Sequence, residues 1–151
     1  MIKAQKRARQ VLRKYNLTTA PIDLQTIIRG ENLILDQWSF HGRVKEVYLG
    51  DSIGIDQTSD PKKQRELIAH ALGHHFLHKG NHLYFEGMDQ FTVFKQEHEA
   101  QCFAAELLMP RKEFNKIKHY KQNQITNHFL VSKDFIQFGQ TIVLKGGLCR
   151  Q

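Results

Sequence analysis

The chain has 151 residues, of which 40% are hydrophobic and 25% charged, with a formal net charge of +7. This length fits one domain with a real core, and the composition excludes the disordered, collagen-like and membrane classes. No stretch reaches the roughly 18 consecutive apolar residues of a membrane span, and the basic start has no apolar run behind it. We therefore expect a cytoplasmic protein that forms a single domain over residues 1–151 and has no membrane partner.

The first half of the chain predicts two helices and a small sheet. Apolar residues recur at helical spacing over residues 4–15, and a short helix is expected over residues 21–30. Three short apolar runs follow between residues 32 and 56, with Gly50 and Asp51 as a turn between the last two. These runs predict a small antiparallel sheet.

The second half predicts helices. A capping residue before Pro61 opens a helix that runs to about residue 79, and another helix spans about residues 96–109, where Pro110 stops it. Helical patterns return in the C-terminal segment, about residues 121–151. The order predicts an α+β domain whose motifs lie on the two central helices.

A pair of histidines on the first central helix has the spacing of metal ligands. The segment RELIAHALGHHFLH places His70 and His74 one turn apart, so both imidazoles can reach one ion at about 2.0 to 2.1 Å. In the HExxH metallopeptidase motif, the next residue after the first histidine is a glutamate that takes a proton from the attacking water. This chain has Ala71 there. Glu66, one turn before His70, lies on the wrong side of the pair to replace it and is expected to be an exposed acid.

A catalytic zinc site needs a third protein ligand and an open position for water. The candidates on the second central helix are Glu97, His98, Glu99 and Glu106, and spacing alone does not choose among them. Glu99 lies at the edge of the apolar stripe and can point inward. Glu97 falls nearer the stripe, but in the first turn of the expected helix. An acid in the first turn has another explanation, because it interacts favourably with the helix dipole. His78 is a candidate hydrogen-bond partner of a ligand.

The strings RELIAHALGHHFLH and EHEAQCFAAELLMP together resemble the ImmA/IrrE family of metallopeptidases. Members carry HELGHxxLH and then E-A-x-x-F-A-A-x-L-L-M-P, whose leading glutamate corresponds to Glu99 here. The resemblance implies a zincin-like α+β fold and a cytosolic location. It also implies one Zn²⁺ bound by His70, His74 and Glu99. In phage and mobile-element members it further implies cleavage of a helix-turn-helix repressor.

The departure at Ala71 separates the functional hypotheses, because loss of a general base typically removes 10²- to 10⁴-fold of rate. The first hypothesis is a zinc metalloendopeptidase that is inactivated in this form. The alternative is a non-catalytic zinc- and peptide-binding regulator of a transcription factor. Direct nucleic-acid binding by the basic segments ranks last, because no base-reading element is evident.

The two cysteines, Cys102 and Cys149, are far apart and lack CxxC spacing. A disulfide is therefore not expected, and a reducing cytosol fits best.

Overall fold

In the computed structural model, the described residues are 3–78 and 90–145. Seven helices and three strands lie within these ranges: α1 (Lys3–Lys14), α2 (Leu24–Gly30), β1 (Ile34–Trp38), β2 (Glu46–Leu49), β3 (Ser52–Asp56), α3 (Pro61–Leu77), α4 (Gln90–Leu108), α5 (Arg111–Ile117), α6 (Gln122–Phe129) and α7 (Lys133–Lys145). The predicted α+β class is confirmed.

One of the two central helices begins where it was predicted, and the other begins earlier. α3 begins as expected, because the Asp60 carboxylate accepts the backbone N–H of Lys63 and Pro61 occupies the first turn. α4 begins at Gln90, well before the predicted residue 96, since the intervening segment contains no glycine or proline to break it. This earlier start changes the position of every acidic residue relative to the helix N-terminus.

The sheet is mixed, whereas an antiparallel sheet was predicted. Its strand order is β1-β3-β2, with β2 and β3 antiparallel across the Gly50–Asp51 turn and β1 and β3 parallel. The turn was predicted correctly, and Gly50 has the positive φ of +65° that favours glycine there. The parallel pairing arises because β3 lies between the two earlier strands, which a pattern of apolar runs cannot reveal.

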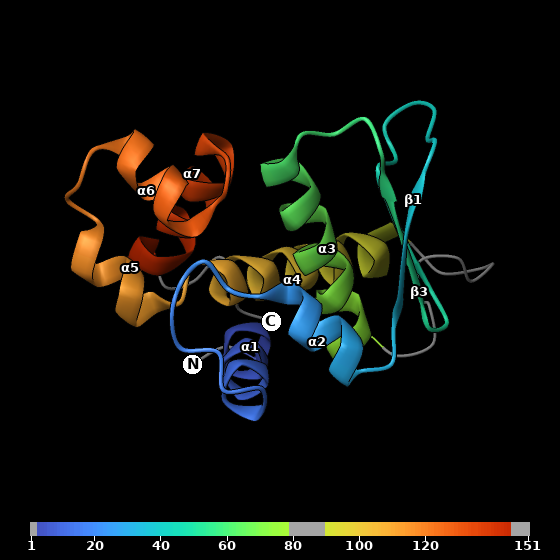
Figure 1. The fold of residues 1–151 in the computed structure, drawn as a ribbon, viewed down its shortest axis with the longest axis horizontal. Helices are drawn as coiled ribbons and strands as arrows, with labels where there is room; N and C mark the ends of the chain where they lie inside the picture. The colour runs from blue at the N-terminus through green and yellow to red at the C-terminus, as the bar shows by residue number, and fades with distance from the viewer. Residues whose placement is uncertain (1–2, 79–89, 146–151) are drawn as a thin grey trace.

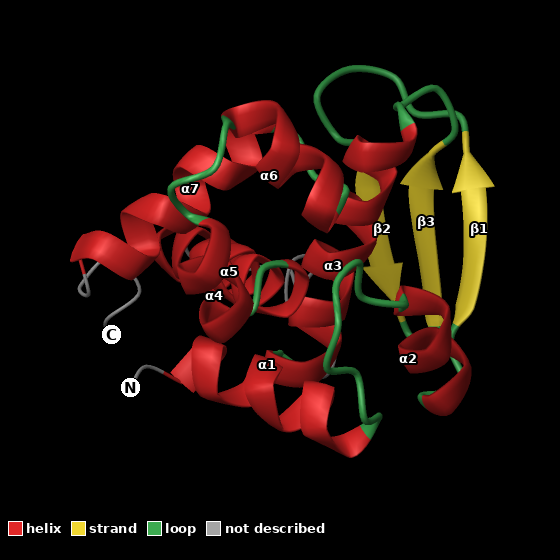
Figure 2. Cartoon of the chain, turned by 60° about the vertical axis from the view of Figure 1, so that its left-hand side comes forward, coloured by secondary structure: helices red, strands yellow, loops and turns green. Residues whose placement is uncertain are grey.

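The two central helices, α3 and α4, pack against each other, and other elements pack around them (Figure 1). The sheet covers α3 through β2 and β3, whereas α1 and α7 pack on α4. Figure 2 shows the strands on one side of the molecule and the helices α5, α6 and α7 away from them. The interface of α3 and α4 is therefore the centre of the core.

Gly73 permits a close approach of α3 and α4. A Cβ atom at this position would lie 2.8 Å from both the Cα and the carbonyl oxygen of Ala100, which no real Cβ atom tolerates. Since Gly73 lies between the two histidines and Ala100 lies between Glu97 and Gln101, this contact brings the polar residues of both helices together. The glycine therefore matters to the site as well as to packing.

A half-buried carboxylate links the N-terminal region to α3. Glu31 accepts hydrogen bonds from Lys14 at 2.8 Å and from Tyr15, and His75 Nε2 lies 2.8 Å from its other oxygen. The second ring nitrogen of His75 contacts the Tyr48 hydroxyl at 2.8 Å, which joins β2 to the same network. His75 therefore has a structural role.

Replacing Glu31 by glutamine is expected to destabilise the protein in a pH-dependent manner. Burial raises the pKa of Glu31, but hydrogen bonds from Lys14, Tyr15 and His75 outweigh burial and lower it to about 2. A carboxyl group whose pKa is lowered by folding stabilises the protein when the pH is above the ordinary pKa of that group. This stabilisation is lost as the pH falls toward the folded-state pKa. We expect Glu31→Gln to lower the free energy of unfolding by about 1 to 3 kcal/mol at pH 7 and by clearly less at pH 3.5. Urea unfolding at both pH values measures this, and an equal loss at both would contradict it.

Cys102 is fully buried on α4 and is disulfide-bonded, so the expectation of two unpaired thiols is wrong for this residue. The other cysteine of the sequence, Cys149, lies outside the described residues. The disulfide removes the cysteine argument for a reducing cytosol, so a cytoplasmic location stays a prediction that rests on the family resemblance. Within residues 3–78 and 90–145, no helix is both long and apolar enough to cross a membrane.

Candidate metal centre

Three side chains from the two central helices converge on one point. The ligand atoms of His70 and His74 on α3 and of Glu97 on α4 all lie within 4.8 Å of one another. The Glu97 carboxylate bridges the imidazoles, with 3.0 Å to His70 Nε2 and 2.8 Å to His74 Nε2. The predicted one-turn spacing of the histidines thus gives convergent nitrogens.

The tautomer of His70 is set by a neighbour on α4. Its Nδ1 lies 2.9 Å from Gln101 Oε1, and since an amide oxygen only accepts, Nδ1 carries the proton. Nε2 is then the nitrogen available to an ion, and it faces Glu97. Such hydrogen bonds commonly orient histidine ligands in metal sites.

His74 is oriented by a buried chain of two further residues. Its Nδ1 lies 3.2 Å from His78 Nδ1, and His78 Nε2 lies 3.0 Å from Glu99 Oε1. The carboxylate accepts from His78 Nε2–H, which leaves His78 Nδ1 to accept from His74 Nδ1–H. His74 Nε2 is therefore directed to the same point as His70 Nε2, and His78 has the partner role considered for it.

The carboxylate beside the histidines is that of Glu97, and Glu99 reaches them only through His78. Residues two apart on a helix point about 200° apart, so these two glutamates cannot both face the pair. Glu97 was disfavoured because it fell in the first turn of the expected helix. Since α4 begins at Gln90, Glu97 lies two turns inside it, and that objection disappears.

The other candidate ligands on α4 lie elsewhere. His98 contacts Cys102 Sγ at 3.6 Å. Glu106 accepts from Arg9 at 3.4 Å and from the backbone N–H of Arg111 at 3.0 Å. Neither belongs to the three-residue cluster.

The electrostatics of the cluster favour a cation. Burial raises the pKa of Glu97, but the hydrogen bonds from His70 and His74 outweigh it and hold this pKa well below its usual range. Burial lowers the pKa of His70, yet the contacts with Glu97 and Glu46 raise it overall. The carboxylate therefore already stabilises positive charge at this point. Two imidazole nitrogens and one carboxylate oxygen form a donor set that suits a catalytic zinc ion, so these residues fit the metal.

Ala71 has no polar side chain to offer, and it is fully buried in the core. Its position between the histidines on α3 is where the HExxH motif has its glutamate. The expectation for Glu66 is wrong, because this residue is buried and accepts the backbone N–H of Ser132 at 2.7 Å.

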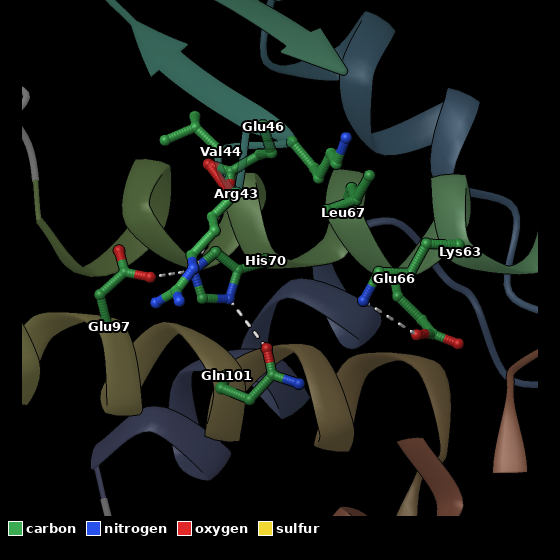
Figure 3. A pocket seen from close by; sticks show the side chains of 10 residues that line it. Arg43, Val44, Glu46, Lys63, Glu66, Leu67, His70, Glu97 and Gln101 are labelled. Carbon is green, nitrogen blue, oxygen red and sulfur yellow. Dashed lines mark hydrogen bonds and ion pairs between the residues drawn. The ribbon is translucent and has the colours of Figure 1, made fainter. Parts of the chain in front are cut away.

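A cavity of about 440 Å³ opens beside the cluster. Its lining residues come from the approach to β2, from α3 and from α4: Arg43, Val44, Lys45, Glu46, Lys63, Glu66, Leu67, His70, Glu97 and Gln101. Figure 3 shows His70 between Glu97 and Gln101 and the Glu46 carboxylate projecting from β2 above them. Sequence reasoning missed Gln101 and Glu46. The alternation of Glu46 and Tyr48 along one strand face was the available signal.

The fold and the cluster define the class. A small sheet packed on a helix with two histidines one turn apart, and a glutamate from the next helix, is the arrangement of a metal-dependent peptidase domain. The peptidase family described as "IrrE N-terminal-like domain" matches residues 33–139. The chain belongs to the ImmA/IrrE family of metallopeptidases.

Two curated relatives are similar to the chain. "Metallopeptidase ImmA" of Bacillus subtilis (strain 168) is 32% identical over 96 residues, which cover 60% of this chain and 54% of the relative. "Uncharacterized immunity region protein 2" of Bacillus phage phi105 is 29% identical over 122 residues, which cover 78% of this chain and 73% of the relative. The chain thus matches about half the length of the first relative.

Proposed function

We propose that this chain is a zinc-dependent metalloendopeptidase-type protein that acts on a helix-turn-helix repressor, and that Ala71 strongly slows hydrolysis. The observation that carries this proposal is the convergence of His70, His74 and Glu97 beside a cavity large enough for a peptide side chain. The family membership supports the same chemistry.

The residues of the site have distinct roles in this proposal. His70, His74 and Glu97 would hold the ion, and Gln101 together with the His78–Glu99 pair orients the two imidazoles. A bound zinc ion would polarise a scissile carbonyl and make water more acidic. Three protein ligands leave a fourth position for that chemistry.

The sheet offers a place for an extended protein segment. Within the described residues, β2 pairs only with β3, so its other edge has free backbone donors and acceptors. Val44, Lys45 and Glu46 at the start of this strand also line the cavity. A peptide that adds to this edge would pass beside the cluster, which supports a protein substrate.

The proposal that the partner is a repressor is based on proteins that are similar to this chain. The name of the phage relative places that protein in an immunity region. The family resemblance of the sequence implies cleavage of helix-turn-helix repressors. Both support a repressor as the partner of this chain.

Ala71 also favours a second candidate function. A chain that holds zinc and binds its partner without cutting would regulate a transcription factor by binding alone. The metal site and the unpaired edge of β2 would then be retained for recognition. The two functions differ only in whether the partner is cleaved.

Binding to a repressor tests the shared part of both functions. We expect the zinc-loaded chain to form a complex with a helix-turn-helix repressor of the same genetic element and to leave most of it uncut for hours. His74→Ala is expected to abolish this complex, because the site loses a ligand and the ion that organises it. Lys118→Ala, a change at an exposed position far from the cluster along the chain, is the matched control. Equal repressor binding by the wild type, with zinc and with chelator, and by His74→Ala would contradict a role for the metal centre in recognition.

A further inference from the structure

The inward face of β2 carries one carboxylate. Glu46 and Tyr48 alternate along the strand and lie opposite Ile55 and Ile53 of β3, both of which are buried. This face of the sheet packs on α3. Glu46 therefore points into the protein from a face that is otherwise built from apolar and aromatic side chains.

The strand is held in register with α3 at its other end. The Tyr48 hydroxyl lies 2.8 Å from His75 Nδ1. Tyr48 lies two strand residues, about 6.6 Å, beyond Glu46. His75 lies five helix residues, about 7.5 Å, beyond His70. Since these rises nearly match, the Tyr48–His75 contact places Glu46 opposite His70.

Within residues 3–78 and 90–145, the carboxylate of Glu46 has an ion-pair contact but no hydrogen-bond donor. Its side chain is only 9% exposed, and His70 Nε2 lies 3.9 Å from its carboxylate, beyond hydrogen-bond distance. In the described part of the chain, no hydrogen bond reaches this side chain. Glu66, which lines the same cavity, is by contrast bound to the backbone of Ser132. A buried carboxylate without a donor is costly, which points to a partner such as water or an ion.

The composition of the cluster favours water over direct coordination, although the 3.9 Å between Glu46 and His70 Nε2 alone would allow both to bind one ion. Two ligands of one zinc ion at about 2.0 to 2.1 Å lie at most about 4.2 Å apart. Glu46 is not one of the three groups whose ligand atoms all lie within 4.8 Å of one another. Glu46 lies just outside the cluster, on the side that faces the cavity.

We propose that Glu46 is the hydrogen-bond acceptor that holds and orients the attacking water at the open side of the His70–His74–Glu97 cluster. It supplies from the strand the carboxylate that Ala71 does not supply from the helix. This assignment rests on the proposed function, because it concerns the same metal centre. It gives a chain with alanine at position 71 a defined residue on which residual hydrolysis depends.

Acetohydroxamate binding to the cobalt-loaded protein tests this assignment without a protein substrate. The compound chelates a metal through its carbonyl oxygen and its deprotonated N–O oxygen, and the released proton passes to a carboxylate beside the metal, which then hydrogen-bonds to the N–O oxygen. Visible absorption of Co²⁺ reports both metal binding and hydroxamate binding. We expect Glu46→Gln to weaken acetohydroxamate binding by about 10-fold or more, because an amide cannot take up the released proton and the charge-assisted hydrogen bond is lost. Cobalt affinity should change by less than about 10-fold. This is smaller than the change that typically follows when a metal ligand loses its hydrogen-bond partner.

Two further variants make the result specific. Glu113→Gln removes a carboxylate on α5 that pairs with His128, and it should leave both affinities unchanged. Glu46→Asp keeps the charge on a shorter arm and should retain part of the hydroxamate affinity. Cobalt bound at one per chain shows that each variant is folded.

The outcomes distinguish failure of this inference from failure of the proposed function. Unchanged hydroxamate affinity in Glu46→Gln, with cobalt bound, overturns the role of Glu46 and leaves the metal centre intact. A loss of cobalt affinity above about 10-fold overturns it as well, because Glu46 would then take part in metal binding itself. A wild-type chain that binds no cobalt overturns both proposals.

Discussion

Introducing a glutamate at position 71 is expected to raise the rate of repressor cleavage by about 10²- to 10⁴-fold. The residue would sit beside His70 on α3, where the HExxH motif places the base that accepts a proton from water and passes it to the leaving amine. Ala71 is fully buried, so the longer side chain must find room toward the cavity, and some loss of stability is expected. Intact-mass measurement of repressor fragments over time gives the rate.

Ala71→Gln is the matched control for this experiment. It adds a side chain of nearly the same size that cannot act as a base, so it should bind zinc and repressor without faster cleavage. Equal acceleration by glutamine and glutamate would show that packing, and not proton transfer, limits the reaction. Zinc and repressor binding without cleavage by Ala71→Glu would favour the non-catalytic regulator.

The second large effect is expected from removal of the Glu97 carboxylate. This group bridges both histidines, so Glu97→Gln takes the only anionic donor from the three-residue cluster. We expect zinc affinity to fall by more than the 10- to 100-fold that follows loss of an outer hydrogen-bond partner. Competition with a chromophoric chelator measures the affinity.

Glu99→Gln provides the comparison, because it is the same change two residues further along α4. Glu99 acts on His74 through His78, so its replacement should lower zinc affinity by about 10- to 100-fold at most. The variant with the larger loss of zinc affinity identifies the glutamate that binds the metal. A larger loss in Glu99→Gln would restore Glu99 as the third ligand and would contradict the geometry described above.

The histidine pair was predictable from sequence because a helix imposes a fixed spacing. A capped start at Asp60 and Pro61 placed α3, and its periodicity placed His70 and His74 on one face. The identity of the third carboxylate was not predictable in the same way. It depended on where α4 begins, and helix starts without a clear breaker or cap are poorly marked in a sequence.

The parts of the site that come from the sheet were also beyond the sequence. The position of Glu46 opposite His70 depends on strand order and on the contact between Tyr48 and His75, both of which are tertiary features. Local patterns of apolar residues predict that strands exist, but they do not fix which strands are neighbours. Gln101 was missed because a single amide on a helix face carries no signal until its partner is known.

A crystal structure of the zinc-loaded chain, with anomalous diffraction measured on both sides of the zinc edge, tests the metal centre most directly. We predict one anomalous peak within about 2.0 to 2.2 Å of His70 Nε2, His74 Nε2 and a Glu97 oxygen. Glu99 should remain bonded to His78. A peak coordinated by Glu99, or no peak at the histidine pair, would contradict this account.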